Sequence, residues 1–223
     1  MPSEGALGRL AVRSVVTIDG PAASGKSSVA RLVAERLGVP FVSSGLLYRA
    51  ATYLALDAGC EIDEPVAVLG EIRGHRVALE PDVEGNRLFI DDRDMTERLH
   101  THEVDATVST VATHPEVREW VNSRLREIPP PFVVEGRDMG TVVFPEAEHK
   151  FYLTAPAAVR ARRRLGERSQ DLDAVTAALL RRDQLDAGRL AMAIDANSID
   201  TGGLSLQEVV AEVLSMLPGE KSG

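Results

Sequence analysis

The amino-acid sequence predicts one α/β domain in which helices flank a parallel sheet, with a modest insertion. The first observation is a strand-to-helix unit: Val15–Asp19 is a short β-branched run, glycines follow it, and Ser27–Leu37 has apolar residues at helical spacing. The second is that short buried-strand candidates recur between helical patterns, at Phe132–Glu135 and Lys150–Leu153. Such alternation favours parallel strands joined by right-handed crossovers.

The remaining segments follow the same pattern except in the middle of the chain. Residues 76–79 and 87–90 alternate polar and apolar side chains on either side of turn residues, which predicts a small antiparallel hairpin. We therefore predict an inserted subdomain over 61–103, a core over 14–60 and 104–218, and flexible ends over 1–13 and 219–223. The other predicted elements are a strand at Phe41–Val42 and helices at Gly45–Ala58, Val104–Ala112, Pro115–Leu125, Leu206–Leu217 and, as an arginine-rich pair, within Ala157–Gly188.

Length and composition limit the classes of function that fit the chain. Its 223 residues suffice for one well-buried domain, and a formal net charge of −9 argues against the basic face of a nucleic-acid-binding protein. A single cysteine, Cys60, cannot form an internal disulfide, which fits a reducing cytoplasm. The start lacks the apolar run of a signal peptide, and no segment approaches the roughly 20 apolar residues that span a bilayer. We expect a cytoplasmic monomer without nucleic-acid or membrane partners.

The strongest motif lies between the first predicted strand and helix. It matches G-x-x-x-x-G-K-[ST] in full, and the residues that would hold a nucleotide are Gly20, Pro21, Ala22, Ala23, Ser24, Gly25, Lys26, Ser27 and Ser28. Glycines let successive backbone N–H groups point at one anion, and the helix N-terminus adds its positive end. Lys26 would reach the β- and γ-phosphates, and the Ser27 hydroxyl would bind magnesium. The motif therefore predicts a P-loop NTPase-type fold that binds a nucleoside triphosphate with Mg²⁺, but it leaves the acceptor open because GTPases, motor ATPases and kinases all share it.

Arginines are placed where they can converge on a second anion. Glu135–Asp138 directly follows a predicted strand, at the end of a parallel sheet where ligands bind. Because guanidinium groups bind phosphate bidentately, several of them together favour a phosphorylated acceptor. The arginines near predicted element ends are Arg49, Arg118, Arg137, Arg182 and Arg189.

A further basic run predicts a short arginine-rich lid over about residues 160–172. A mobile lid of this kind can close over a triphosphate and neutralise charge in the transition state. A solvated helix face is the alternative. The run comprises Arg160, Arg162, Arg163, Arg164 and Arg168.

From Val15 to Met216 the chain resembles bacterial cytidylate kinases, which are P-loop nucleoside monophosphate (NMP) kinases. Besides the P-loop, four ordered segments carry the resemblance: Ser44–Arg49, Ser109–Arg118, Gly136–Pro145 and Arg182–Arg189. The resemblance implies that the insertion at 61–103 is an NMP-binding subdomain. It also implies that ATP phosphorylates the small-molecule substrates CMP and dCMP.

The resemblance assigns roles residue by residue. Ser109, Arg118 and Asp138 would hydrogen-bond the cytosine edge, since a carboxylate accepts from the cytosine amine but repels the uracil carbonyl. Arg182 and Asp186 would lie beside the ribose. The acceptor phosphate would be held by Arg49, Arg137 and Arg189, with Ser44 and Tyr48 in the same site. The residues that would act on the transferred group are Lys26, Arg137, Arg162, Arg164 and Arg189.

Three departures from the family pattern stand out. Ser43 takes the place of the family's usual aspartate, which removes a carboxylate near the metal. The stretch between Arg189 and Asp195 is short and lacks the family's proline–leucine pair, so we expect a rebuilt loop on the ribose side. The lid between Arg164 and Asp171 also looks short.

Other classes of function also fit parts of the sequence. A kinase for shikimate or dephospho-coenzyme A would share the P-loop, although the insertion and Gly136–Pro145 count against both. A GTPase-type switch needs a guanine-reading N-K-x-D element, which the sequence lacks. A purely structural role fits a complete phosphate loop least well. His100, His102 and His114 show no ligand spacing, and we expect all three at the surface.

Overall fold

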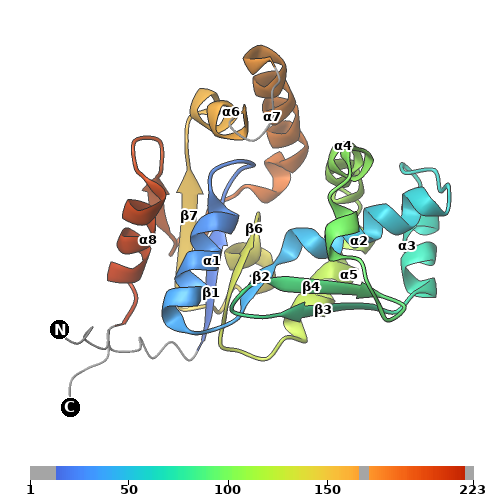
Figure 1. The fold of residues 1–223 in the computed structure, drawn as a ribbon, viewed down its shortest axis with the longest axis horizontal. Coiled ribbons are helices and arrows are strands. Elements are labelled where there is room, and N and C mark those ends of the chain that lie inside the picture. The colour runs from blue at the N-terminus through green and yellow to red at the C-terminus, as the bar shows by residue number, and fades with distance from the viewer. Residues whose placement is uncertain (1–13, 166–170, 219–223) are drawn as a thin grey trace, which may run out of the picture.

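A computed structural model describes residues 14–165 and 171–218. Its centre is a five-stranded parallel sheet in the order β2-β6-β1-β7-β8 (Figure 1). This arrangement confirms the predicted α/β class. The predicted flexible ends and the middle of the predicted lid lie outside the described residues. The strands are β1 (Val15–Asp19), β2 (Phe41–Ser43), β6 (Phe132–Gly136), β7 (His149–Thr154) and β8 (Asn197–Asp200).

Helices cover both faces of this sheet, because successive strand side chains point to opposite faces. On one face α1 (Lys26–Leu37) and α8 (Leu206–Ser215) pack on side chains such as Val16, Ile18 and Phe151. On the other face Val42, Phe132 and Val134 pack on helices from the middle of the chain. These helices are α2 (Ser44–Asp57), α4 (His102–Val111) and α5 (Pro115–Arg126).

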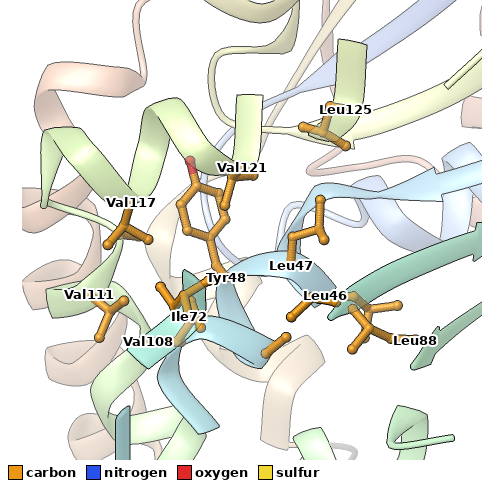
Figure 2. Packing of buried hydrophobic residues seen from close by; sticks show 14 of the residues in the cluster. Leu46, Leu47, Tyr48, Ile72, Leu88, Val108, Val111, Val117, Val121 and Leu125 are labelled. Atoms are coloured by element: carbon orange, nitrogen blue, oxygen red, sulfur yellow. The ribbon is translucent and has the colours of Figure 1, made fainter. Parts of the chain in front are cut away.

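The second core joins the sheet to the inserted region. Leu46 and Leu47 of α2 lie near Leu88 of the small sheet, and the Tyr48 ring lies near Val117 and Val121 of α5 (Figure 2). All these side chains are nearly or fully buried. Because one continuous apolar cluster holds α2, α5 and the small sheet, the Ser44–Arg49 segment has a fixed position.

The inserted region contains the predicted antiparallel hairpin and more. A three-stranded sheet in the order β3-β4-β5 pairs Val77 with Ile90 and Leu79 with Leu88. Its turn is attached to the main sheet, because the Phe41 N–H donates to the Asp82 carbonyl at 3.0 Å. Helix α3, which the sequence reasoning did not predict, precedes the hairpin. The elements are α3 (Pro65–Gly74), β3 (Val77–Pro81), β4 (Asn86–Ile90), β5 (Arg93–Asp94) and the short helix η1 (Thr96–Leu99).

The last third of the chain supplies the elements around the cleft. A π-helical turn, η2 (Met139–Val143), follows β6, and α6 (Ala157–Leu165) packs against α7 (Leu172–Asp186), which leads into η3 (Ala187–Arg189). The expectation for His114 is wrong: it is buried, and its Nε2 lies 2.7 Å from the Ile62 carbonyl oxygen. No helix within the described ranges is long and apolar enough to cross a membrane.

Candidate active site

A cleft of about 460 Å³ opens at the carboxyl ends of β1 and β6, where open α/β sheets bind ligands. P-loop residues line it together with residues from α2, α4 and the 135–139 segment. Of the residues predicted for binding or catalysis, the following line it: Ala22, Ala23, Lys26, Ser27, Ser44, Tyr48, Arg49, Ser109, Arg137, Asp138, Arg164, Arg182, Asp186 and Arg189.

The other predicted residues stand outside this lining. Gly20, Pro21, Ser24, Gly25 and Ser28 belong to the loop and the first turn of α1 without facing the cavity. Arg118 does not line the cavity, but its guanidinium contacts Asp138, which does. Arg162 is exposed on α6 and does not line the cavity, so its role in phosphoryl transfer remains a prediction.

The P-loop adopts a conformation that suits an anion. Gly20 and Gly25 have φ angles of 144° and 94°, and Ala23 also lies in the left-handed region at 58°. A Cβ atom on Gly20 would stand 2.0 Å from the Leu153 carbonyl oxygen, so only glycine fits against β7. Helix α1 begins at Lys26 without a side-chain cap, which leaves its first N–H groups for a ligand.

Lys26 is buried at the bottom of the cleft. Its Nζ donates to the Pro21 carbonyl at 2.8 Å, within the loop itself. Burial, with the nearby charge of Arg137, lowers the pKa of Lys26 from 10.5 to about 7. A bound polyanion would reverse this shift, because it would stabilise the charged form of the ammonium group.

Two arginines of α6 hold the P-loop from outside. Arg160 is buried and donates to the Ala22 carbonyl at 3.0 Å, while its guanidinium forms a bidentate pair with Asp183 on α7 at 2.6 and 3.3 Å. Arg163 donates to the Thr201 hydroxyl at 2.8 Å, and that hydroxyl donates to the Ser24 carbonyl at 3.2 Å. These contacts occupy the backbone carbonyls of Ala22 and Ser24 in the loop. The sequence placed both arginines in the lid run without assigning them this contact.

Three predicted acceptor-side residues form one buried group. Asp186 accepts from Arg137 Nε at 2.8 Å and from Arg189, and both Asp186 and Arg189 are buried. Arg182 lines the same cavity, and burial, together with the charge of Arg137, lowers its pKa from 12.5 to about 10. Three guanidinium groups around one carboxylate leave an excess of positive charge for an anion.

Arg49 reaches the cleft from α2. Its guanidinium donates to the Leu99 carbonyl at 3.0 Å and pairs with Asp105 at 2.6 Å. These contacts fix its guanidinium at the wall formed by α4 and η1. The four arginines that resemblance assigns to the phosphate and ribose of the acceptor therefore line a single cavity.

The groups predicted to read a base also meet at this cavity. Arg118 Nη2 lies 2.6 Å from Asp138 Oδ2, and the Asp138 side chain is almost fully buried. Ser109 of α4 and Asp138 both line the cavity. Burial, reinforced by the Asp138 charge, raises the pKa of the neighbouring Tyr48 to about 12. Tyr48 therefore stays protonated at neutral pH and can donate a hydrogen bond.

The structure adds polar residues that the candidate list lacked. Glu135 is buried in the cavity wall, and its Oε1 accepts from the Ser43 hydroxyl at 2.9 Å. Asn86 also lines the cavity and accepts from the Ser43 N–H at 3.1 Å. Glu135 stands at the end of a predicted buried strand, so its place near the ligand crevice could be predicted from the sequence. Asn86 had no such signal, because the hairpin's place against β2 is a tertiary feature.

Asp19 has a structural role beside the P-loop. Its two carboxylate oxygens accept from the N–H groups of Met139 and Gly140 at 2.9 and 2.7 Å. Burial outweighs these hydrogen bonds and raises the pKa of Asp19 to about 6. The contact ties the end of β1 to the turn after β6, and so fixes the P-loop relative to Arg137 and Asp138.

Comparison with known proteins assigns the chain to a family. The sequence model for "Cytidylate kinase" matches residues 16–218. This chain belongs to the cytidylate kinase family. The cytidylate kinase of Thermus thermophilus is 59% identical over 204 residues, covering 92% of this chain and 98% of that protein. The cytidylate kinase of Deinococcus radiodurans is 57% identical over 200 residues, covering 90% and 97%.

Similarity to solved structures agrees at the level of the fold. The shikimate kinase of Bacteroides thetaiotaomicron superposes with a TM-score of 0.50 at 14% identity, over 92% of this chain and 99% of that one. The family match confirms the resemblance to cytidylate kinases, and this structural likeness agrees with a P-loop kinase fold. The chain is a phosphotransferase that uses nucleotides.

Proposed function

We propose that this kinase transfers the γ-phosphoryl group of ATP to CMP and dCMP, giving ADP and CDP or dCDP. One observation supports the proposal: Lys26 of the P-loop, the cluster of Arg137, Arg182 and Arg189, and Asp138, which pairs with Arg118, line a single cleft. Together these groups suit a donor phosphate, an acceptor phosphate and a base.

The donor side of the proposal rests on the P-loop. The uncapped start of α1 and the left-handed residues Ala23 and Gly25 suit the β- and γ-phosphates of ATP. Mg²⁺ would enter with ATP and neutralise phosphate charge; no cluster of three or more His, Cys, Asp or Glu side chains suited to a metal occurs in the described ranges. The residues that fit it are the Ser27 hydroxyl, as a ligand, and the Glu135 carboxylate, for which no lysine or arginine ion pair is found among described residues.

The acceptor phosphate would occupy the arginine cluster. In a direct in-line transfer, a phosphate oxygen of CMP attacks the γ-phosphorus, the bond to the β-phosphate oxygen breaks, and ADP leaves with those electrons. The attacking oxygen is already anionic, so no strong general base is required. Lys26 and the arginines Arg137 and Arg189 would stabilise charge that spreads over the transferred group, and Arg164 would approach it from α6.

Base selection would come from Asp138 and its neighbours. Arg118 contacts Oδ2 of Asp138, and the carboxylate would accept from the exocyclic amine of cytosine. Ser109 and Arg118 would serve the remaining edge, and Asp186 would accept from a ribose hydroxyl. Uracil would place a carbonyl against Asp138 and leave a buried charge unsatisfied.

The remaining parts of the proposal concern motion and context. The small sheet and α3, within residues 61–103, would act as the NMP-binding subdomain, and residues 160–172 as the lid. Both would close only with two nucleotides bound, which excludes water from ATP. We also propose that the kinase works as a cytoplasmic monomer without nucleic-acid or membrane partners, in keeping with its single cysteine and net charge of −9.

A coupled assay of ADP release tests the proposal. Purified protein receives MgATP with CMP, dCMP, UMP, AMP or shikimate as acceptor. CMP and dCMP should be phosphorylated best, and ATP hydrolysis without an acceptor should be slow. Preference for another acceptor, or a fast acceptor-independent ATPase, would contradict it. Light scattering after gel filtration, with and without both nucleotides, checks the monomer.

A further inference from the structure

The segment between Arg189 and β8 is anchored by few apolar contacts. From Leu190 to Ala196 no side chain is buried, and Met192 and Ile194 are exposed by 48% and 104%. Apolar packing therefore cannot fix the path of this segment. Its course still matters, because it directly follows the buried pair Asp186 and Arg189 of the acceptor site.

The side chains of Tyr152 and Lys150, both on strand β7, attach the segment to the main sheet. The Tyr152 hydroxyl donates to the Leu190 carbonyl at 2.9 Å, one residue after Arg189. Further along, Lys150 Nζ donates to both carboxylate oxygens of Asp195, at 3.0 and 2.8 Å, and to the Pro145 carbonyl at 2.6 Å. The segment is thus held at both ends by alternate residues of one strand.

The anchoring strand lies beside the P-loop strand. Tyr152 is the register partner of Asp19, the residue that precedes the loop, and Lys150 is the partner of Thr17. The stem of Lys150 also packs against Gly140, whose N–H donates to Asp19. Any position that β7 imposes on residues 190–195 is therefore a position relative to the donor loop.

The two partners of the Lys150–Asp195 ion pair differ in burial. The Lys150 side chain is only 5% exposed, whereas that of Asp195 is 58% exposed. A buried ammonium group must be satisfied by acceptors, so the segment that supplies the carboxylate is drawn to a fixed place. Tyr152 adds a neutral hydrogen bond at the end nearest the active site.

We propose that Lys150, Tyr152 and Asp195 are positioning residues that set Arg189 and Asp186 against the P-loop for acceptor binding. None of the three lines the cleft. Their polar contacts hold a segment that is short, lacks a proline–leucine pair and buries no apolar side chain between Leu190 and Ala196. The inference rests on the proposed function, because it takes the group around Arg189 as the acceptor-phosphate site.

Steady-state kinetics of Tyr152→Phe, Asp195→Asn and Lys150→Met test the proposal. Each should raise KM for CMP by roughly two- to tenfold, the effect of one lost hydrogen bond, and leave KM for ATP unchanged. Asp195→Glu keeps the carboxylate and should recover much of the CMP affinity. Matched controls are Tyr53→Phe and Asp57→Asn, whose side chains make no hydrogen bond to any residue within 14–165 or 171–218 and do not line the cleft; they should behave as wild type.

A second measurement separates positioning from general damage. Hydrogen exchange of the backbone amides should rise across 187–196 in the three variants, with the P-loop and α5 unchanged. Unaltered exchange and unaltered KM for CMP would overturn the inference, and so would equal losses for CMP and ATP. If wild-type protein does not phosphorylate CMP, the proposed function fails, while the exchange measurement still decides whether β7 holds the segment.

Discussion

Arg118 and Asp138 form an ion pair with 2.6 Å between Nη2 and Oδ2, and Asp138 lines the same cleft as Lys26. The pair consumes one oxygen of a carboxylate that is only 4% exposed, and no hydrogen bond to Oδ1 is found within the described part of the chain. A buried carboxylate oxygen without a donor invites one from a ligand. The pair can therefore be both a structural contact and a base reader, and the two roles predict different results.

Asp138→Ala should raise KM for CMP and reduce the preference for CMP over UMP. Losing a charged hydrogen bond in a desolvated pocket costs about 1.5–3 kcal/mol, roughly ten- to a hundredfold in affinity. Discrimination falls as well, because the carboxylate no longer repels the uracil carbonyl. The measurement is kcat/KM for both monophosphates. If Asp138 only neutralises Arg118, the mutant loses stability or affinity and the CMP-to-UMP ratio stays at the wild-type value.

Arg137→Ala should weaken all pyrimidine monophosphates alike. Arg137 contacts Asp186 through Nε and lies in the arginine cluster, away from the Arg118–Asp138 pair. Its removal takes a charge from the acceptor phosphate without touching the base. Asp186 keeps Arg189 as a partner, so the fold should survive. The same assay, with CMP and UMP, checks this; a selective loss of CMP would place Arg137 at the base instead.

Gly20→Ala should destabilise the protein far more than an alanine at another left-handed glycine. A Cβ on Gly20 would meet the backbone of β7 at 2.0 Å, which requires the central strands to shift, and we expect a loss of about 3 kcal/mol or more. Gly59 has a φ of 67° with open space around it, so Gly59→Ala isolates the backbone strain, about 1–2 kcal/mol. Urea unfolding of both variants gives the comparison. Equal losses would mean that the contact with Leu153 relaxes freely.

The sequence predicted the elements that build the donor site because those elements have strong local signals. Buried parallel strands read as short apolar runs, and β1, β6 and β7 begin and end within one residue of their predicted positions. Helix α3 has a weaker signal: Pro65 suits its first turn, but Val66 points outward with 77% exposure, which blurs its apolar face. Strand β8 was missed since it is polar and buries only Ile199.

Site residues at strand ends were predictable, whereas their partners were not. Lys26 and Asp138 could be identified because each belongs to a sequence motif that directly follows a predicted strand, β1 or β6. The contacts of Arg160 with Ala22 and Asp183 join residues up to 138 positions apart, and no local pattern encodes them. His114 shows the same limit: its burial depends on the Ile62 carbonyl in another part of the fold.

Lys26→Ala should abolish turnover and leave the fold intact. The lysine supplies charge to the transferred group, and comparable groups in phosphoryl transfer are worth orders of magnitude in rate. Its removal should not unfold the protein, because a pKa lowered to about 7 means that burial of the ammonium group opposes folding at neutral pH. Circular dichroism with single-turnover kinetics checks both statements. Near-normal turnover in a folded mutant would remove Lys26 from the mechanism.

Binding of ATP should take up a proton through Lys26 in mildly alkaline solution. The pKa of Lys26 in the free protein is about 7, so at pH 8 most molecules carry the neutral amine. The phosphates of ATP favour the ammonium form and raise that pKa, so about one proton is bound with the nucleotide at pH 8, and ATP affinity falls as the pH rises above 7. Because the folded pKa lies below the unfolded value of 10.5, the unliganded protein should gain stability as the pH rises from about 7 toward 10.5.

Calorimetric titration with MgATP in two buffers of different ionisation enthalpy gives the number of protons that Lys26 takes up. Lys26→Met, which cannot titrate, is the control, and wild-type protein at pH 6 should show little uptake. Equal uptake by wild type and Lys26→Met at pH 8 would assign the proton to another group.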